Sequence, residues 1–243
     1  MTYEEIVSAW KNKKIINSAA LDVTVGDLVT EYAYHTTRLE IPTVTKNDTH
    51  DVLKTGTVTN YTGSVRDIIS IQNSKYGWEY LLYCFDANAV MDEPLVKEFH
   101  RILTGGSYDD KRYIDGERPG HYKKHDFVTG RYEIGALAED VPDEMAELLE
   151  DIKDAPAEKA LRAAAFFHAK FENIRPFADG NGRAGRLLMN YFLVMHDHPF
   201  IIIHEEDSRD YMSALEAWDR SQSLDELEAV LKEQTVKTWE GRI

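Results

Sequence analysis

The chain has 243 residues and a formal net charge of −15, from 28 basic and 43 acidic residues. This acidity argues against a nucleic-acid-binding protein, which would bind by neutralising phosphates, although a nucleotide site needs only a few local cations. No apolar run approaches the ~20 residues of a membrane helix, the polar start predicts no secretory signal, and Cys84, the single cysteine, excludes an intramolecular disulfide. We therefore expect a cytoplasmic protein with no nucleic-acid or membrane partner.

Apolar residues recur at helical spacing along most of the chain, which predicts a mainly α-helical fold. An amphipathic helix over residues 2–13 comes first, and residues 26–40 form a second helix that Pro42 ends. Residues 47–56 have the pattern of a capped helix closed by Gly56. Further helices are expected over 64–85, where Gly77 interrupts the pattern, and over 92–106, 142–154, 156–174, 181–196, 208–222 and 223–239, with a buried extended or turn segment over 200–204.

The segment 105–140 breaks the helical pattern because it is rich in glycine, aspartate and lysine. Within it, YKKHDFV, TG and RYEI follow one another as in a β-hairpin with its turn at Thr129-Gly130. No repeat and no Pro/Ser-rich linker divides the chain. We therefore expect one compact domain in which N-terminal helices over residues 1–60 pack on a core over residues 61–243.

The residues from Gly180 to Gly185 read G-x-G-x-x-G, the pattern of dinucleotide-binding loops. That pattern requires a strand before the glycines, whereas the residues upstream are predicted to be helical and no alternation of strands and helices surrounds the loop. We therefore reject a Rossmann-type site. A glycine-rich turn that leads into a helix still exposes unpaired N–H groups at the positive end of the helix dipole, where phosphate binds well.

Three charged residues in this turn favour a nucleotide with a metal ion. Arg183 and Arg186 are three residues apart at the predicted helix start, so both can face one anion, and guanidinium groups match phosphate oxygens. The carboxylate of Asp179 would repel phosphate, because both are anions. Its position is better explained by a Mg²⁺ ion that binds the carboxylate and also contacts the phosphates. Each residue alone fits a helix cap or a surface charge equally well; together, in one turn, they favour a phosphate site.

The stretch from Arg175 to Arg186, RPFADGNGRAGR, resembles the signature H-P-F-x-[DE]-G-N-G-R-x-x-R of Fic-domain proteins. The helices around it resemble the Fic core, so the resemblance covers roughly residues 26–235. It implies a mainly α fold, a Fic-type helical bundle with a β-hairpin flap. It also implies a protein adenylyltransferase, which moves AMP from ATP to a Ser, Thr or Tyr hydroxyl of a target protein with the help of Mg²⁺.

The resemblance assigns roles to individual residues of the loop. Asp179 would hold Mg²⁺. Asn181, Gly182 and Arg183 would cradle the α- and β-phosphates, and Arg186 would hold the γ-phosphate. The implied nucleotide-binding set is completed by Gly180, Gly185 and, near the adenine base, Tyr211.

The predicted hairpin would be the flap that docks the target's backbone as an added strand. The implied docking residues are Tyr122, Lys123, His125 and Phe127. The target protein is unidentified, and self-modification and a homodimer partner both fit the resemblance, because target choice depends on surface detail that a single sequence does not encode.

The second predicted helix ends in TTRLE, residues 36–40, which resembles the inhibitory motif [ST]-x-x-x-E-[GN] of Fic proteins, here placed before the core. Thr36 and Glu40 are four residues apart and share one helix face. By resemblance, Glu40 would pair with Arg186, so that ATP binds with its α-phosphate misaligned for attack. Ile41 stands where Gly or Asn is usual. The alternative is an ordinary surface ion pair of Glu40, worth under ~1 kcal/mol.

Arg175 stands where the family motif has its catalytic histidine. Imidazole suits a general base because its pKa lies near the operating pH, whereas a guanidinium stays protonated and has no acceptor lone pair. Loss of such a base typically costs on the order of 10²–10⁴ in rate, although Arg175 could still contact the α-phosphate as a cation. His168, His121 and His125 are alternative proton acceptors, but nothing in the sequence places them at the α-phosphate.

Three hypotheses therefore stay open. The first is an adenylyltransferase held off by Glu40 and impaired by Arg175. The second is a nucleotide-binding or interaction module that has kept the fold and lost the reaction. The third is an altered chemistry on the same scaffold, either another phosphate transfer or the removal of AMP.

Overall fold

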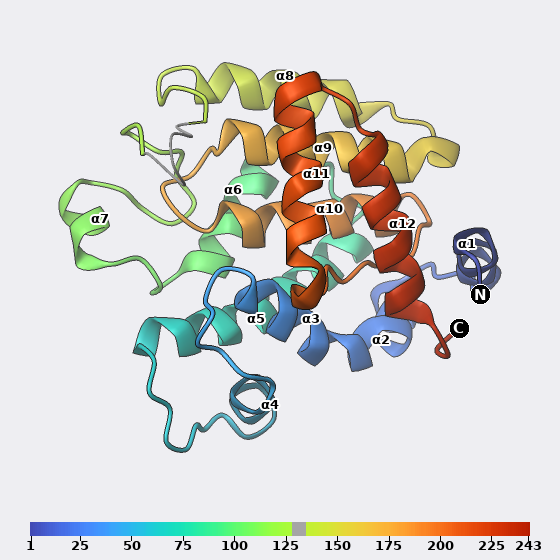
Figure 1. Ribbon diagram of the computed structural model, residues 1–243, viewed down its shortest axis with the longest axis horizontal. Helices are drawn as coiled ribbons and strands as arrows, with labels where there is room; N and C mark the ends of the chain where they lie inside the picture. Colours follow the sequence, from blue (N-terminus) through green and yellow to red (C-terminus); the bar gives the residue numbers. More distant parts are fainter. Residues whose placement is uncertain (128–134) are drawn as a thin grey trace.

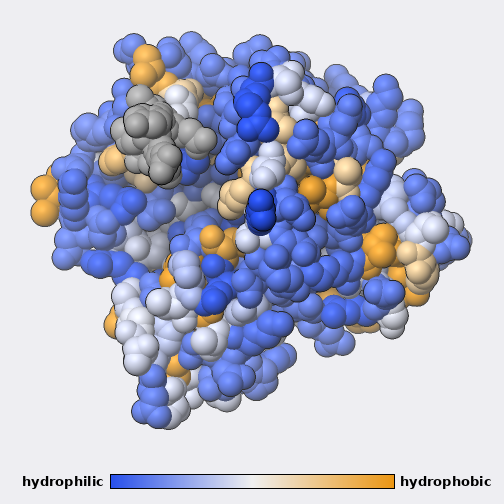
Figure 2. All heavy atoms as spheres, in the orientation of Figure 1, coloured by the Kyte–Doolittle hydropathy of each residue, from blue (hydrophilic) through white to orange (hydrophobic). Residues whose placement is uncertain are grey.

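A computed structural model describes residues 1–127 and 135–243, and all regular secondary structure in these ranges is helical, which confirms the mainly helical fold that the sequence predicts (Figure 1). The helices are α1 (Tyr3–Asn12), α2 (Ser18–Val25), α3 (Val29–Arg38), α4 (Lys46–Thr55), α5 (Val65–Asp86), α6 (Glu93–Thr104), α7 (Asp110–Ile114), α8 (Val141–Lys153), α9 (Ala160–Ile174), α10 (Asn181–Met195), α11 (Ser208–Ser221) and α12 (Asp225–Trp239), with short 3₁₀ turns η1 (Gly26–Leu28), η2 (Ala157–Lys159) and η3 (Glu205–Asp207). Within the described ranges, none of these helices is long and apolar enough to span a membrane. The face in Figure 2 is largely hydrophilic, with hydrophobic residues in scattered spots.

Local side-chain chemistry sets the ends of several helices. Thr2, Thr45 and Ser64 each form a capping box at the start of α1, α4 and α5, in which side chain and backbone exchange hydrogen bonds across the first turn. Asp92 caps α6 by accepting from the backbone N–H of Leu95. Because only short-range contacts are involved, these ends follow closely from the sequence.

Helix α10 lies at the centre of the molecule, and nearly all of its residues are buried (Figure 1). Helices α9, α5, α6 and α3 pack against it, which explains why buried apolar residues occur on all of its sides. Gly77 of α5 lies at this contact: a Cβ there would lie 2.7 Å from Leu187 Cδ2 and 2.9 Å from Leu103 Cδ2. The glycine that interrupts the apolar pattern of α5 therefore allows close packing.

The N-terminal helices share the hydrophobic core with the rest of the chain. Trp10 of α1 meets Trp239 of α12 edge to face at 5.3 Å, and Tyr32 of α3 meets Phe200 in the same way at 5.1 Å. Helix α3 also packs against α4, α5 and α10. This packing brings the end of α3 to the start of α10.

Several expectations about the elements need correction. The predicted helix over 26–40 begins with η1 and ends as α3 at Arg38, so Glu40 lies in the turn that follows. Helices α2 and α7 were not predicted. The turn at Thr129-Gly130 lies outside the described residues, and the described part of 105–140 contains no strand, so the predicted β-hairpin is not confirmed.

The apolar run of residues 200–204 crosses the core as an extended segment and pairs with no strand in the described ranges. Side chains satisfy its backbone instead. Asn190 exchanges two hydrogen bonds with Ile201, at 2.7 and 2.9 Å, and Gln234 Oε1 accepts from the His204 N–H at 2.8 Å. Such partners are required because an unpaired buried backbone group is costly.

Candidate functional site

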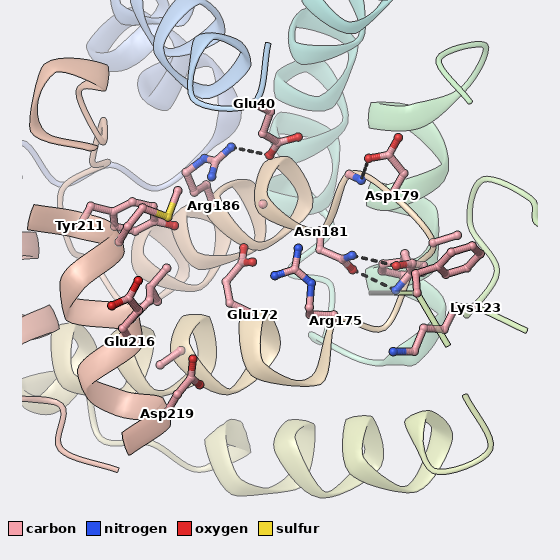
Figure 3. Close-up of a pocket in the computed structure, with 18 of the residues that line it drawn as sticks. Glu40, Lys123, Glu172, Arg175, Asp179, Asn181, Arg186, Tyr211, Glu216 and Asp219 are labelled. Carbon is pink, nitrogen blue, oxygen red and sulfur yellow. Dashed lines mark hydrogen bonds and ion pairs between the residues drawn. The ribbon is translucent and has the colours of Figure 1, made fainter. Parts of the chain in front are cut away.

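Residues 175–180 form the loop that links α9 to α10. Both of its ends are left-handed: Arg175 ends α9 with φ 49° and ψ 64°, and Gly180 begins α10 with φ 74°. The Asn181 side chain closes the turn, because Oδ1 accepts from the Phe177 N–H at 2.9 Å and Nδ2 donates to the Phe177 carbonyl at 2.8 Å (Figure 3). Asn181 therefore holds the shape of the loop.

His100, which the sequence analysis did not single out, braces this loop from α6. Its Nδ1 accepts from the Gly120 N–H at 2.9 Å, so the ring proton lies on Nε2, which donates to the Asp179 carbonyl at 2.8 Å. The ring stacks on Phe177 with centroids 3.6 Å apart, and burial lowers the pKa of His100 to about 3. A histidine within an apolar helix gives no sequence signal that distinguishes this role from core filling.

A pocket of about 520 Å³ opens at the start of α10 (Figure 3). It joins segments that are far apart in the chain: the loop, α9, α10, α11 and the turn after α3. Its lining residues are Glu40, Arg112, Lys123, Phe127, Ala169, Glu172, Arg175, Phe177, Ala178, Asp179, Gly180, Asn181, Gly182, Arg186, Tyr211, Met212, Leu215, Glu216 and Asp219.

Glu40 binds both motif arginines rather than Arg186 alone. Its Oε2 accepts from Arg183 Nε at 3.0 Å and its Oε1 from Arg186 Nη2 at 2.8 Å. Thr36 adds two contacts to Arg186: Nε donates to Thr36 Oγ1 and Nη2 donates to the Thr36 carbonyl, both at 2.9 Å. The two arginine side chains are only 4% and 3% exposed, so Glu40 neutralises nearly buried charge.

The electrostatics of this cluster favour an ionised carboxylate. Burial acts to raise the pKa of Glu40, but the guanidinium groups of Arg183 and Arg186 outweigh it and hold the pKa below its ordinary value. Gly182 allows the close approach, because a Cβ there would collide with Glu40 Oε1 and lie 2.8 Å from Arg186 Nη1. Its lack of a side chain therefore has a specific steric reason.

Asp179 lies at the pocket with its side chain 37% exposed. Its Oδ1 accepts from the Gly180 N–H at 2.8 Å, and its Oδ2 lies 3.6 Å from Arg112 Nη2. The first contact is to the adjacent residue and caps no N–H of the first turn of α10, and the second oxygen lies toward Arg112, another residue that lines the pocket. A single carboxylate beside room for phosphates matches how Mg²⁺ is commonly held, by one or two carboxylates together with substrate oxygens. The residues present therefore fit that ion.

Glu172 of α9 is a pocket residue that the sequence analysis did not identify. Its Oε1 is buried and has no hydrogen-bond partner within the described ranges. Burial raises the pKa of its carboxyl to about 7, against the opposing charges of Arg186 and Arg175. Arg175 itself lines the pocket, and Figure 3 shows its side chain beside Glu172 and Asn181.

His168 and Gly185 lie behind the pocket rather than on its wall. Burial lowers the pKa of His168 to about 3, and its Nε2 contacts the hydroxyl of Tyr211, which does line the pocket. A Cβ on Gly185 would lie 3.0 Å from Phe171 and 3.1 Å from His168 Nδ1. Gly185 therefore lets α9 and α10 pack closely.

The four residues assigned to target docking separate in the structure. Lys123 and Phe127 line the pocket, and the Lys123 N–H donates to the Pro176 carbonyl at 2.9 Å. Tyr122 packs against Phe177 at 5.5 Å, and His125 Nδ1 lies 2.8 Å from Glu117 Oε1. Only part of this set therefore faces the site.

Fold and site together define a helical protein whose central helix begins with glycines beside a pocket, where Arg186 lines the wall and Arg183 lies behind it, bound to Glu40. Residues 90–193 match the Fic/DOC family. This match lies over the loop and the helices around it and confirms the resemblance to Fic-domain proteins drawn from the motif.

Known relatives agree with this assignment. The chain is 25% identical over 206 residues to protein adenylyltransferase Fic of Drosophila ananassae, covering 80% of this chain and 38% of that protein. It is 26% identical over 205 residues to protein adenylyltransferase fic-1 of Caenorhabditis briggsae, covering 82% and 38%. The chain thus spans less than two fifths of the length of these curated relatives.

Solved structures show the shared fold. A Fic domain containing signaling protein from Bacteroides thetaiotaomicron has a TM-score of 0.80 at 24% identity, over 97% of this chain and 93% of that one. Fic-1 from C. elegans has a TM-score of 0.76 at 20% identity, over 97% of this chain and 70% of that one. The similarity extends beyond residues 90–193 to nearly the whole described fold.

Proposed function

We propose that this chain is a nucleotide-binding Fic protein of the adenylyltransferase type, which moves AMP from ATP to a Ser, Thr or Tyr hydroxyl of a protein. The observation that carries the proposal is the contact of Glu40 with Arg183 and Arg186. Two nearly buried guanidinium groups at the start of a helix form an anion site, and a carboxylate of the same chain fills it. The relatives named protein adenylyltransferase support the same reaction class.

In this proposal the phosphates lie on the first turn of α10, where Asn181 and Gly182 offer backbone N–H groups and the arginines supply charge. Asp179 would hold Mg²⁺, which would supply positive charge to the phosphate oxygens. The base lies toward Tyr211 and its neighbours on α11. The pocket volume of about 520 Å³ is in the usual range for small-molecule sites.

Autoinhibition follows from competition for the same cations. Glu40 uses Arg186 Nη2 and Arg183 Nε, the groups that would receive the β- and γ-phosphates. While these contacts persist, ATP binds weakly or with its α-phosphate out of line for attack. Thr36 strengthens the block because it holds Arg186 in place from α3.

Arg175 gives the second candidate function, a nucleotide-binding module without transfer. A guanidinium in the pocket attracts phosphate but accepts no proton. We therefore expect the chain to keep ATP binding while the rate of AMP transfer is reduced on the order of 10²–10⁴ relative to a protein with histidine at this position. Altered phosphate transfer or AMP removal stays the third candidate.

Transfer of label from α-labelled ATP to protein tests the proposal. The chain as it stands should label itself or lysate proteins weakly, and Arg175→His combined with Glu40→Gly should label strongly. A silent double variant that still binds ATP by calorimetry supports the binding module. A double variant that neither labels nor binds ATP would remove both candidates. γ-Labelled ATP and an AMP-modified protein, offered separately, test the third.

A further inference from the structure

A cluster outside the pocket joins α3 to the extended segment 200–204. Glu31 and His35 are four residues apart on one face of α3, and His204 reaches them from the segment. One carboxylate oxygen and one nitrogen of each imidazole lie within 4.8 Å of one another. Both rings are buried, and they meet edge to face at 4.7 Å.

Hydrogen bonds fix the orientation of His204. Gln234 Nε2 donates to Asp207 Oδ2 at 2.8 Å, which sets the amide, and Gln234 Oε1 lies 2.8 Å from His204 Nδ1. An amide oxygen only accepts, so Nδ1 carries a proton, and in the neutral ring Nε2 has the lone pair. That lone pair faces Glu31 Oε1 at 3.7 Å. The Nε2 lone pair and the Oε1 oxygen are both acceptors, so a proton or a cation must lie between them for the contact to be favourable.

Glu31 supplies a charged oxygen to the same point. The guanidinium of Arg242 binds this carboxylate from the side away from the imidazoles. Arg242 Nη2 donates to Oε2 at 2.9 Å, which leaves Oε1 directed at the imidazoles. The carboxylate is 32% exposed, so an ion has a route in from solvent.

His35 is arranged to become a ligand by a shift of one proton. Its Nδ1 accepts from the Glu205 N–H at 3.0 Å, which leaves the ring proton on Nε2. Coordination through Nε2 moves the ring proton to Nδ1, which lies 3.8 Å from Glu206 Oε2. The exchange replaces a backbone contact with a carboxylate–histidine contact of the kind that orients metal-binding histidines.

We propose that Glu31, His35 and His204 form a binding site for a divalent transition metal of the zinc class. Two imidazoles and one carboxylate suit Zn²⁺, Co²⁺ or Ni²⁺, whereas Mg²⁺ prefers oxygen ligands alone. Three protein ligands leave a fourth position for water. The ligand atoms need to draw together from their present spacing, and the exposed Glu31 side chain has the freedom to do so.

Such an ion would fasten α3 to the core beside the candidate pocket. The residue after His35 is Thr36, whose hydroxyl and carbonyl hold Arg186. Metal binding would therefore stabilise the arrangement that presents Glu40 to the arginines. The site itself does not depend on the proposed nucleotide chemistry, so its test stands apart from that proposal.

Tag-free protein, stripped with a chelator, is titrated with Co²⁺ and followed by visible absorption, and bound Zn²⁺ is counted by elemental analysis after dialysis. We expect one ion per chain and the intense bands of low-coordinate Co²⁺ with nitrogen ligands. Glu31→Gln and His204→Gln should each raise the Kd at least about tenfold. His50→Gln, at an exposed histidine of α4, is the matched control and should leave the Kd unchanged.

Absent Co²⁺ bands and absent Zn²⁺ uptake in the stripped protein would overturn the proposal and leave a proton-linked Glu31–His204 ion pair. Uptake that is equal in the parent chain and in Glu31→Gln would overturn it as well. If His204→Gln fails to fold, Glu31→Gln decides the question, because its side chain lies at the surface. A rise in Tm with Zn²⁺ that Glu31→Gln loses and His50→Gln keeps would support it.

Discussion

Replacing Glu40 with glutamine should destabilise the fold and, at the same time, open the pocket to ATP. The substitution removes the charge that neutralises Arg183 and Arg186, whose side chains are 4% and 3% exposed. Two guanidinium groups would then face each other with little solvent. They become a vacant anion site, which is the arrangement that triphosphate requires.

The size of the effect follows from the burial of the three groups. Breaking one side of a buried ion pair costs about 3–5 kcal/mol. The Glu40 side chain is 25% exposed and glutamine keeps one acceptor oxygen, so the loss here should be roughly 2–3 kcal/mol. For a chain of this length, that free energy corresponds to a Tm lower by roughly 4–12 °C.

Thermal unfolding with and without Mg·ATP measures both consequences. At an ATP concentration about 100 times the Kd of Glu40→Gln, ATP should raise the free energy of unfolding of that variant by about 2.7 kcal/mol. The same concentration should stabilise the parent chain much less. Glu98→Gln is the control, because Glu98 pairs with Arg101 on the surface, where the side chains are 36% and 58% exposed. It should cost under about 1 kcal/mol and leave ATP binding unchanged.

The reasoning is refuted if Glu40→Gln lowers the Tm no more than Glu98→Gln and ATP shifts both variants equally. A lower Tm without any gain in ATP binding would support the stabilising role of the Glu40 ion pairs but contradict the idea that Glu40 competes with nucleotide. Calorimetry at matched temperature separates the two results, since it reports the ATP Kd directly.

Further predictions concern the same cluster and its neighbours. Burial acts to raise the pKa of Glu40, but the charges of the two arginines outweigh it and lower that pKa. The stabilisation by Glu40 is therefore present above about pH 4.5 and is lost as the pH falls through the lowered pKa of the folded state. The free energies of unfolding of Glu40→Gln and the parent chain, measured in urea, should become equal in acid. Glu172→Gln should be more stable than the parent chain by about 2–3 kcal/mol at pH 8 and equally stable near pH 4.5. The reason is that the pKa of the Glu172 carboxyl is raised from 4.5 to about 7, so its ionisation opposes folding. Equal stability of the two proteins at both pH values would contradict this. Gly182→Ala should lower the Tm in the parent chain and less so in Glu40→Gln, because the added methyl displaces the Glu40 carboxylate; additive effects in a double-mutant cycle would argue against that contact.

The sequence by itself determined what depends on near neighbours along the chain. Most of the helices followed from apolar periodicity, and some of their ends followed from local signals such as Gly56, because these signals act within one or two turns. The loop from Arg175 to Arg186 was recognisable for the same reason, since its glycines, its acid and its arginines lie within twelve positions. The Fic/DOC match confirms that reading of the motif.

Only the tertiary structure decided which distant groups meet. Glu40 reaches Arg183 across 143 residues and His100 reaches Asp179 across 79, and neither distance leaves a periodic signal. Gly77 looked like a weak point in a helix until the packing of α5 on α10 showed that a side chain has no room there. These contacts depend on how distant segments pack together in the folded chain. A buried charge is costly unless it is paired, and here the partner lies far away in the sequence.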